Sequence, residues 1–239
     1  MRTIVLGDIH GRDCWKKIVD QDFDRVIFIG DYFDTHEDVT GLEQLDNFKS
    51  ICEFKRKQIN LGKEVILLIG NHDFHYFPEI SYTGTSGYQS RMKMVFEDAI
   101  NENRDLLQMC FIDENKYIYS HAGITKSWCA NVDINIYNQN IHEIVLSINE
   151  LFYTQPRKFN FYAGDRSGYG DNVHQSPIWV RPNSLYRDKL NFMQIIGHTR
   201  VNKIGHPPKN ERRGFYVIDC LPLEYLLIDG KIEIKSVKE

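Results

Sequence analysis

The chain has 239 residues, of which 42% are hydrophobic and 26% charged, and its formal net charge is −4. This composition excludes disordered and fibrous proteins, and the length fits one α/β domain, predicted to span residues 1–239. The small negative charge argues against a protein held to nucleic acid or an anionic membrane by bulk electrostatics, although a local basic patch stays compatible with it.

Three apolar runs of strand length come first in the chain, and each is stopped by a glycine and a polar residue. Such runs are typical of strands buried on both faces, so their carboxyl ends are predicted to deliver polar side chains to one sheet edge. That edge is where open α/β sheets bind their ligands. The runs are residues 3–6, 26–29 and 65–69, followed by Gly7-Asp8, Gly30-Asp31 and Gly70-Asn71.

Two helices are predicted between these strands. Residues 12–22 have the length of a short helix. Residues 37–61 carry apolar side chains at steps of three and four, as an amphipathic helix requires, and Gly62 follows where a C-cap residue belongs. The first 70 residues therefore read β-α-β-α-β.

The rest of the chain is predicted to add a helix around 141–152 and several strands. Asp229-Gly230 between the last two strands is a strong hairpin signal. The stretch 162–171, rich in Gly, Asp and aromatic residues, is expected to be an ordered loop over the site. The predicted strands are 117–120, 193–196, 215–218, 225–228 and 231–235.

The five cysteines are widely spaced and form no C-x-x-C pair, so reduced and mostly structural thiols are expected. The apolar run at the N-terminus is too short for the core of a signal peptide. No apolar stretch approaches the ~20 residues of a membrane span. A cytoplasmic enzyme with no membrane partner is the expectation.

Five short motifs place Asp, Asn or His directly after an apolar run, where the backbone can hold them rigidly. A single Gly-Asp after a strand is usually a turn, and a single histidine is usually packed or solvated. Turn formation alone does not explain five such placements, because turns have no need of histidine. The motifs are G-D-I-H-G at 7–11, G-D-Y-F-D at 30–34, G-N-H-D at 70–73, S-H-A-G at 120–123 and G-H-T at 197–199.

The combined pattern resembles the calcineurin-like metallophosphoesterase superfamily over residues 7–199, with D-x-H, G-D-x-x-D, G-N-H-[DE] and two later His motifs. The resemblance implies a four-layer α-β-β-α sandwich, with mixed sheets flanked by helices, and a binuclear metal centre. By position it implies six metal ligands: Asp8 and His10 for the first metal, Asp31 as the bridge, and Asn71, His121 and His198 for the second.

Carboxylate, amide and imidazole ligands together suit Mn²⁺, expected here, or Fe or Zn²⁺, better than Ca²⁺ or a structural zinc site. Two such metals hold a shared hydroxide as nucleophile and clamp the phosphoryl oxygens for in-line attack. The resemblance assigns His72 to protonating the leaving-group oxygen, and Asp34 to orienting His72 through a hydrogen bond. The histidines that match no motif are expected to be surface or core residues: His36, His75, His142, His174 and His206.

Two positions depart from the wider pattern. Many members end in G-H-x-H, but here the last position is Arg200, which is similar to the phosphoprotein phosphatase branch and its bacterial and phage relatives. That branch has a phosphate-gripping arginine after G-D-Y-x-D, whereas this chain has Thr35. Arg181, in I-W-V-R-P, is the first candidate to replace it, since the segment resembles one found in bacterial relatives. Arg91 and Arg166 are further candidates, with a solvated surface role as the alternative for all three arginines.

The leading hypothesis is a phosphomonoesterase acting on a phosphoprotein or a small phosphoester, of which a Ser/Thr phosphoprotein phosphatase is one form. The alternative enzyme is a nucleotide or phosphodiester hydrolase acting on a dinucleoside polyphosphate, a cyclic nucleotide or a nucleic-acid end. In that case the aromatic loop at Tyr162–Tyr169 would stack a base. A non-catalytic scaffold is disfavoured, because every ligand position and His72 are intact.

Overall fold

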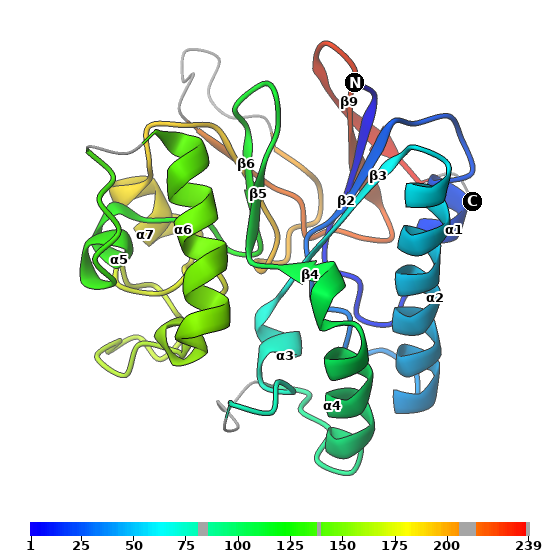
Figure 1. The fold of residues 1–239 in the computed structure, drawn as a ribbon, viewed down its shortest axis with the longest axis horizontal. Coiled ribbons are helices and arrows are strands. Elements are labelled where there is room, and N and C mark those ends of the chain that lie inside the picture. Colours follow the sequence, from blue (N-terminus) through cyan, green and yellow to red (C-terminus); the bar gives the residue numbers. More distant parts are fainter. Residues whose placement is uncertain (81–85, 138–139, 206–213, 238–239) are drawn as a thin grey trace.

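The computed structural model describes residues 1–80, 86–137, 140–205 and 214–237. Two β-sheets lie in the middle of the molecule, with helices on either side of them (Figure 1). Both sheets are mixed, so the implied class of two mixed sheets flanked by helices is confirmed.

The larger sheet has the strand order β10-β9-β1-β2-β3-β4. Strands β1 to β4 run parallel to one another, whereas β9 is antiparallel to both β1 and β10. The carboxyl ends of β1, β2 and β3 therefore meet at one edge. The six strands are β1 (Thr3–Leu6), β2 (Arg25–Phe28), β3 (Glu64–Leu68), β4 (Leu107–Gln108), β9 (Glu224–Ile228) and β10 (Ile232–Ser236).

The smaller sheet has the order β5-β6-β7-β8. β5 and β6 are antiparallel, while β6, β7 and β8 are parallel to one another. Its strands are β5 (Cys110–Ile112), β6 (Ile118–Ser120), β7 (Gln194–Ile196) and β8 (Phe215–Val217).

Side chains on the central strands alternate between two apolar layers. Ile4 and Leu6 of β1 belong to the core that also includes Phe48 of helix α2, whereas Val5 packs in the layer that contains Tyr119 and Ile195 of the smaller sheet. Both faces of β1 are thus buried, which explains why the strand is apolar at every position from Ile4 to Leu6.

Helices α1 and α2 lie on one side of the sheets, and α5, α6 and α7 lie on the other (Figure 1). Helix α2 begins with a capping box, in which Thr40 and Glu43 satisfy each other's backbone N–H groups. The helical segments are α1 (Trp15–Ile18), α2 (Gly41–Asn60), α3 (Asn71–Phe74), α4 (Lys93–Glu102), η1 (Arg104–Leu106), α5 (Lys126–Asn131), α6 (Ile141–Thr154), η2 (Pro156–Phe159) and α7 (Pro182–Asp188).

Every predicted strand is present to within one residue at each end, but the helix predictions need correction. The helix predicted over 12–22 is wrong in length: only Trp15–Ile18 is helical. The Asn47 side chain donates a hydrogen bond to the Arg12 carbonyl (3.0 Å), and the Gln21 side chain donates one to the Ile18 carbonyl (2.6 Å). These two carbonyls lie at the two ends of α1. In a longer helix they would accept hydrogen bonds from backbone N–H groups, but here they accept from side chains. Several short elements, including α4, were not predicted.

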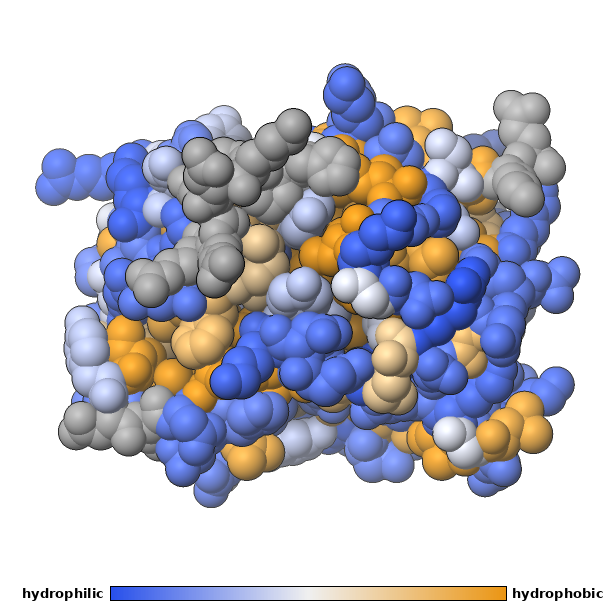
Figure 2. All heavy atoms as spheres, turned by 90° about the horizontal axis from the view of Figure 1, so that it is seen from above, coloured by the Kyte–Doolittle hydropathy of each residue, from blue (hydrophilic) through white to orange (hydrophobic). Residues whose placement is uncertain are grey.

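No helix in the described part of the chain combines the length and apolar character needed to cross a bilayer. Figure 2 shows the face seen from above in Figure 1, where hydrophilic side chains are interspersed with smaller apolar areas. All five cysteines are free and four are buried, as expected for structural thiols.

Candidate metal centre and active site

The predicted motifs converge on a pocket of about 310 Å³ at the carboxyl ends of the strands. Asp8, Asp31 and Asn71 follow β1, β2 and β3 of the larger sheet and line this pocket. His121 and His198 follow β6 and β7 of the smaller sheet. The parallel central strands of both sheets therefore end at one place, and the predicted convergence is confirmed.

The predicted ligand side chains contact one another directly. Potential ligand atoms of Asp8, Asp31 and His121 all lie within 4.8 Å of one another. His121 Nε2 is 2.9 Å from Asn71 Oδ1 and 3.4 Å from Asp31 Oδ2. His198 Nδ1 is 2.7 Å from the same Asn71 oxygen. We call these five residues the ligand cluster.

His10 lies at the edge of this cluster, with its Nε2 atom 3.7 Å from Asp31 Oδ2. A backbone carbonyl sits opposite one ring nitrogen of each predicted histidine ligand, which leaves the other nitrogen directed at the cluster. The pairs are His10 Nδ1 with Phe33 O (3.0 Å), His121 Nδ1 with Ile29 O (3.1 Å) and His198 Nε2 with Trp179 O (3.1 Å).

The contacts of His198 indicate whether the residues of the ligand cluster are suited to bind a metal ion. Burial, Arg181 and His121 lower the pKa of His198 well below its ordinary value, so the ring is neutral and carries one proton. Its two nitrogens face Asn71 Oδ1 and Trp179 O, and both oxygens are acceptors. One of these contacts therefore places two lone pairs against each other. A cation between them would turn that repulsion into coordination, so the donor set fits a divalent metal.

Negative charge is concentrated at the same place. Burial, together with the carboxylates of Asp219 and Asp31, raises the pKa of Asp8 well above its ordinary value. Although burial opposes it, His121 and His72 lower the pKa of Asp31. Asp219 also lines the pocket and is only 8% exposed, although it was not predicted as a site residue. A bound cation would offset the mutual repulsion of these carboxylates.

The backbone at the motifs is held in unusual conformations. Left-handed φ angles between 44° and 62° occur at His10, Asp31, Asp34 and His198, all of them predicted site residues. Non-glycine residues rarely adopt this region, and such strain is concentrated at functional sites.

Asp73 and two glycines explain why the motifs have these residue types. The Asp73 carboxylate accepts backbone N–H groups from Asp31 (2.8 Å) and Gly70 (2.9 Å), which ties the loops after β2 and β3 together. A Cβ atom at Gly70 would collide with the Asp31 carboxylate, and one at Gly197 would collide with that of Asp8. Only glycine permits these approaches.

His72 lies on α3 and lines the pocket beside the ligand cluster. Its backbone N–H donates to Asp31 Oδ1 (2.9 Å), and its Nδ1 atom is 3.3 Å from Asp34 Oδ2. Although burial lowers it, Asp31 and the hydrogen bond with Asp34 raise the pKa of His72. The structure therefore brings His72 and Asp34 together in the predicted pair.

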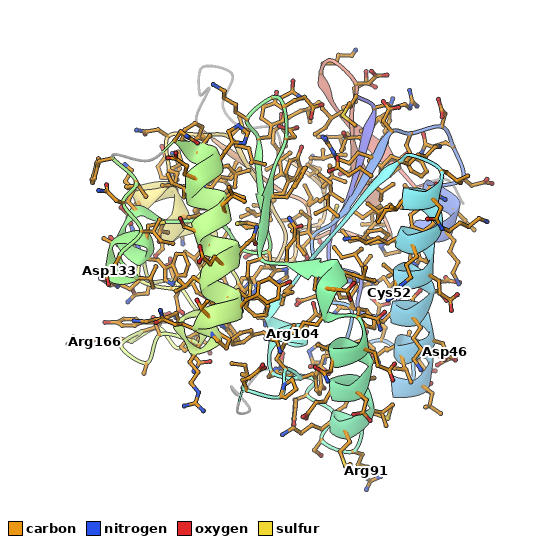
Figure 3. The ribbon with its side chains drawn as sticks, in the orientation of Figure 1. Asp46, Cys52, Arg91, Arg104, Asp133 and Arg166 are labelled. Carbon is orange, nitrogen blue, oxygen red and sulfur yellow. The ribbon has the colours of Figure 1, made fainter. Side chains whose placement is uncertain are left out.

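The three candidate arginines occupy different places. Arg181 lines the pocket, and its Nη1 atom donates to the His198 carbonyl (2.7 Å) and to Thr199 Oγ1 (3.1 Å). Arg91 and Arg166 are exposed at the periphery and are not brought to the pocket (Figure 3).

Asp34 has partners that sequence reasoning missed. His75 Nε2 is 2.8 Å from Asp34 Oδ2, and the Tyr76 hydroxyl donates to Asp34 Oδ1 (2.6 Å). His75 is fully buried, in line with a core position, but it contacts a site carboxylate. The spacing of three residues from His72, on one turn of helix, was the available signal. His206 lies outside the described residues.

The family model described as calcineurin-like phosphoesterase matches residues 1–199. The symmetrical bis(5'-nucleosyl)-tetraphosphatase of Klebsiella pneumoniae is 27% identical over 137 residues, which cover 54% of this chain and 45% of that protein. The enzyme of the same name from Photorhabdus laumondii is 25% identical over 180 residues, covering 67% of this chain and 60% of that protein. The chain thus matches about half the length of these curated relatives.

Among solved structures, the cold-active protein-tyrosine phosphatase of a Shewanella species superposes with a TM-score of 0.64. The match covers 99% of this chain and 80% of that chain, at 14% sequence identity. At this identity the likeness shows a shared fold.

Proposed function

Because this chain belongs to the calcineurin-like phosphoesterase family, a family of binuclear, divalent-metal-dependent hydrolases, we propose that it hydrolyses phosphomonoesters at the ligand cluster. It is a metallophosphoesterase, and the finer assignment of its substrate is our proposal. The main observation behind this proposal is the buried group of Asp8, Asp31 and His121, together with the contacts that Asn71 makes with His121 and His198.

Six side chains would hold the cations, for which Mn²⁺ is proposed, with Fe or Zn²⁺ as alternatives. Two bound divalent cations supply a water of lowered pKa and positive charge for the phosphoryl oxygens. The proposed ligands are Asp8 and His10 on one side, Asp31 between the two, and Asn71, His121 and His198 on the other.

His72 is proposed as the general acid. With Nδ1 directed at the Asp34 carboxylate, its Nε2 atom is left to donate a proton to the leaving-group oxygen. The raised pKa of His72 supports this role, because the ring must carry the second proton near neutral pH.

Arg181 is proposed to bind the substrate phosphate. Its Nε atom donates to the Tyr169 carbonyl (2.8 Å) and its Nη1 atom to the His198 carbonyl, which fixes the guanidinium at the pocket. Nη2 makes no hydrogen bond within the described residues, so it is left for a phosphate oxygen.

A dinucleoside polyphosphate is the second candidate substrate. The curated relatives are named symmetrical bis(5'-nucleosyl)-tetraphosphatases. Phe161, Tyr169 and Trp179 also line the pocket, and Tyr169 is 79% exposed, as a ring that stacks on a base would be. A cytoplasmic location and a phosphoprotein partner stay predictions.

A substrate panel assayed with Mn²⁺ tests the proposal. It would contain para-nitrophenyl phosphate, its bis ester, a phosphopeptide, diadenosine tetraphosphate and cyclic nucleotides. Highest kcat/KM on a phosphomonoester supports the first proposal, whereas highest kcat/KM on diadenosine tetraphosphate supports the second. Turnover of none of these esters would overturn both.

A further inference from the structure

The Asp34 carboxylate is a fully buried hydrogen-bonding centre beside the ligand cluster. Its Oδ2 atom faces two imidazoles, His75 Nε2 at 2.8 Å and His72 Nδ1 at 3.3 Å. Its Oδ1 atom accepts from the Tyr76 hydroxyl (2.6 Å) and from Gln89 Nε2 (3.3 Å). The shorter imidazole contact is the one to His75, which the proposed chemistry does not use.

The direction of the proton between His75 and Asp34 follows from their environments. Burial lowers the pKa of His75, so this ring is neutral. Although burial opposes it, hydrogen bonds from His72, His75 and Tyr76 lower the pKa of Asp34, so this group is an ionised carboxylate that only accepts. His75 therefore carries its proton on Nε2 and donates it to Asp34.

The donors around Asp34 are themselves held in place. Tyr88 stacks on Tyr76, with ring centroids 5.4 Å apart and an interplanar angle of 17°, and meets the His75 ring edge-on at 4.9 Å. The Gln89 backbone N–H donates to the Tyr76 hydroxyl (3.0 Å). The segment before α4 thus contacts Asp34 through Gln89, and Tyr88 packs against the rings of both His75 and Tyr76.

We propose that His75 is a positioning residue for the general acid: by donating Nε2–H to Asp34 Oδ2, it holds that oxygen where it accepts Nδ1–H of His72. The inference rests on the proposed function, in which His72 delivers a proton to the leaving group. Without the His75 bond, the Asp34 carboxylate would turn toward Tyr76 and Gln89, and His72 would lose the contact that fixes its tautomer.

Kinetics on two leaving groups test this role. His75→Ala should lower kcat for an alkyl phosphate by about 10-fold, the lower range for loss of an outer hydrogen-bond partner. It should leave kcat for para-nitrophenyl phosphate and both KM values within about 2-fold, because a phenolate departs without a proton. His75→Gln keeps an N–H donor and should restore most of the alkyl rate.

Two comparisons separate positioning from general loss of packing. Tyr119→Phe removes a buried hydroxyl that donates to Asp113 (2.9 Å) in the smaller sheet, and it should leave the alkyl-to-aryl rate ratio unchanged. In an Asp34→Asn background, His75→Ala should have no further effect on that ratio, because it acts through Asp34. An equal rate loss for both esters, or an undiminished effect in the Asp34→Asn background, would overturn the proposal.

A spectroscopic readout decides the role of His75 independently of turnover. Long-range ¹H–¹⁵N spectra of the histidine rings, recorded at a pH high enough that His72 carries one proton, should show the Nδ1–H tautomer at His72 in the wild-type protein, and a tautomer mixture in His75→Ala. If the wild-type chain turned over neither ester, the proposed function would be wrong, but the ring spectra would still test whether His75 positions His72. An unchanged His72 tautomer in His75→Ala would contradict the positioning role.

Discussion

Buried carboxylates occur in two parts of the site, and the protein treats them differently. Around Asp34 the chain supplies N–H and O–H donors from His72, His75, Tyr76 and Gln89, so the charge is satisfied within the protein. In the ligand cluster, Asp8 and Asp31 instead lie close to each other and to His121, and each accepts a backbone N–H, from His198 and His72 respectively.

This difference in surroundings indicates that the buried carboxylates in the two parts of the site have different functions. A carboxylate surrounded by donors is fixed in position and can orient a neighbouring histidine. Carboxylates that face one another with few donors are costly unless a cation joins them. We therefore expect variants in the ligand cluster to change metal binding first, and variants around Asp34 to change proton transfer with the metals still in place.

Asp31→Asn should have the largest effect, because it removes the charge at the centre of the ligand cluster. We expect cation affinity to fall by more than about 100-fold, since outer hydrogen-bond partners of ligands alone are worth 10–100-fold. Metal analysis after dialysis measures this loss. Asp46→Asn, an exposed change on α2, is the matched control and should retain its metal (Figure 3). If the Asp31→Asn protein retained its full metal content, the proposed distinction between a metal-binding part and a proton-transfer part of the site would be wrong.

His72→Asn should come next, with both cations retained because the six proposed ligands remain. We expect kcat to fall by about 10² to 10⁴, the range for a positioned proton donor. The loss should be greatest for an alkyl phosphate and least for para-nitrophenyl phosphate. His142→Asn, at an exposed position on α6, serves as the control. Loss of one metal from the His72→Asn protein, or an equal fall in kcat for both esters, would contradict the assignment of His72 as a general acid.

Arg181→Ala should weaken substrate binding, with cation content unchanged. Loss of a charged hydrogen bond of about 1.5–3 kcal/mol corresponds to a rise in KM of roughly 10-fold to 100-fold. Arg91→Ala and Arg166→Ala, which remove exposed guanidinium groups, should change KM less than about 2-fold. Steady-state kinetics on a phosphomonoester compare the three variants, and a larger effect at Arg91 than at Arg181 would reverse the assignment.

Asp34→Asn should give the smallest of these effects. The amide keeps the shape of the side chain but loses the charge that orients His72, so we expect about a 10-fold fall in kcat on alkyl phosphates and retained metals. Metal analysis beside kinetics on both esters checks this. A cation loss like that of Asp31→Asn would mean that Asp34 belongs to the ligand cluster.

Sequence reasoning predicted those site residues that follow a local rule relating an apolar run to the residue after it. An apolar run that ends in Gly7-Asp8, Gly30-Asp31 or Gly70-Asn71 places a polar side chain at a strand end whatever the rest of the chain does. All the predicted strands are therefore found, and the structure brings the ligand cluster together. The prediction of one domain over residues 1–239 stays a prediction.

Features that depend on distant residues were not predicted. His75 contacts Asp34, 41 positions away, and the three-residue spacing from His72 does not by itself identify Asp34 as the partner. The helix over 12–22 is shortened in part by Asn47, 35 residues beyond the Arg12 carbonyl that it binds. Asp219 is different, because it directly follows the apolar run 215–218 but has no glycine before it, so a rule that required only a polar residue after an apolar strand would have found it.

The most direct test of the metal-dependent account is a titration of metal-free protein with Mn²⁺, followed by metal analysis and by para-nitrophenyl phosphate hydrolysis. The account predicts no activity after chelation, and activity that rises with Mn²⁺ and levels off at two ions per chain. Full activity in protein shown to be free of metal would contradict it.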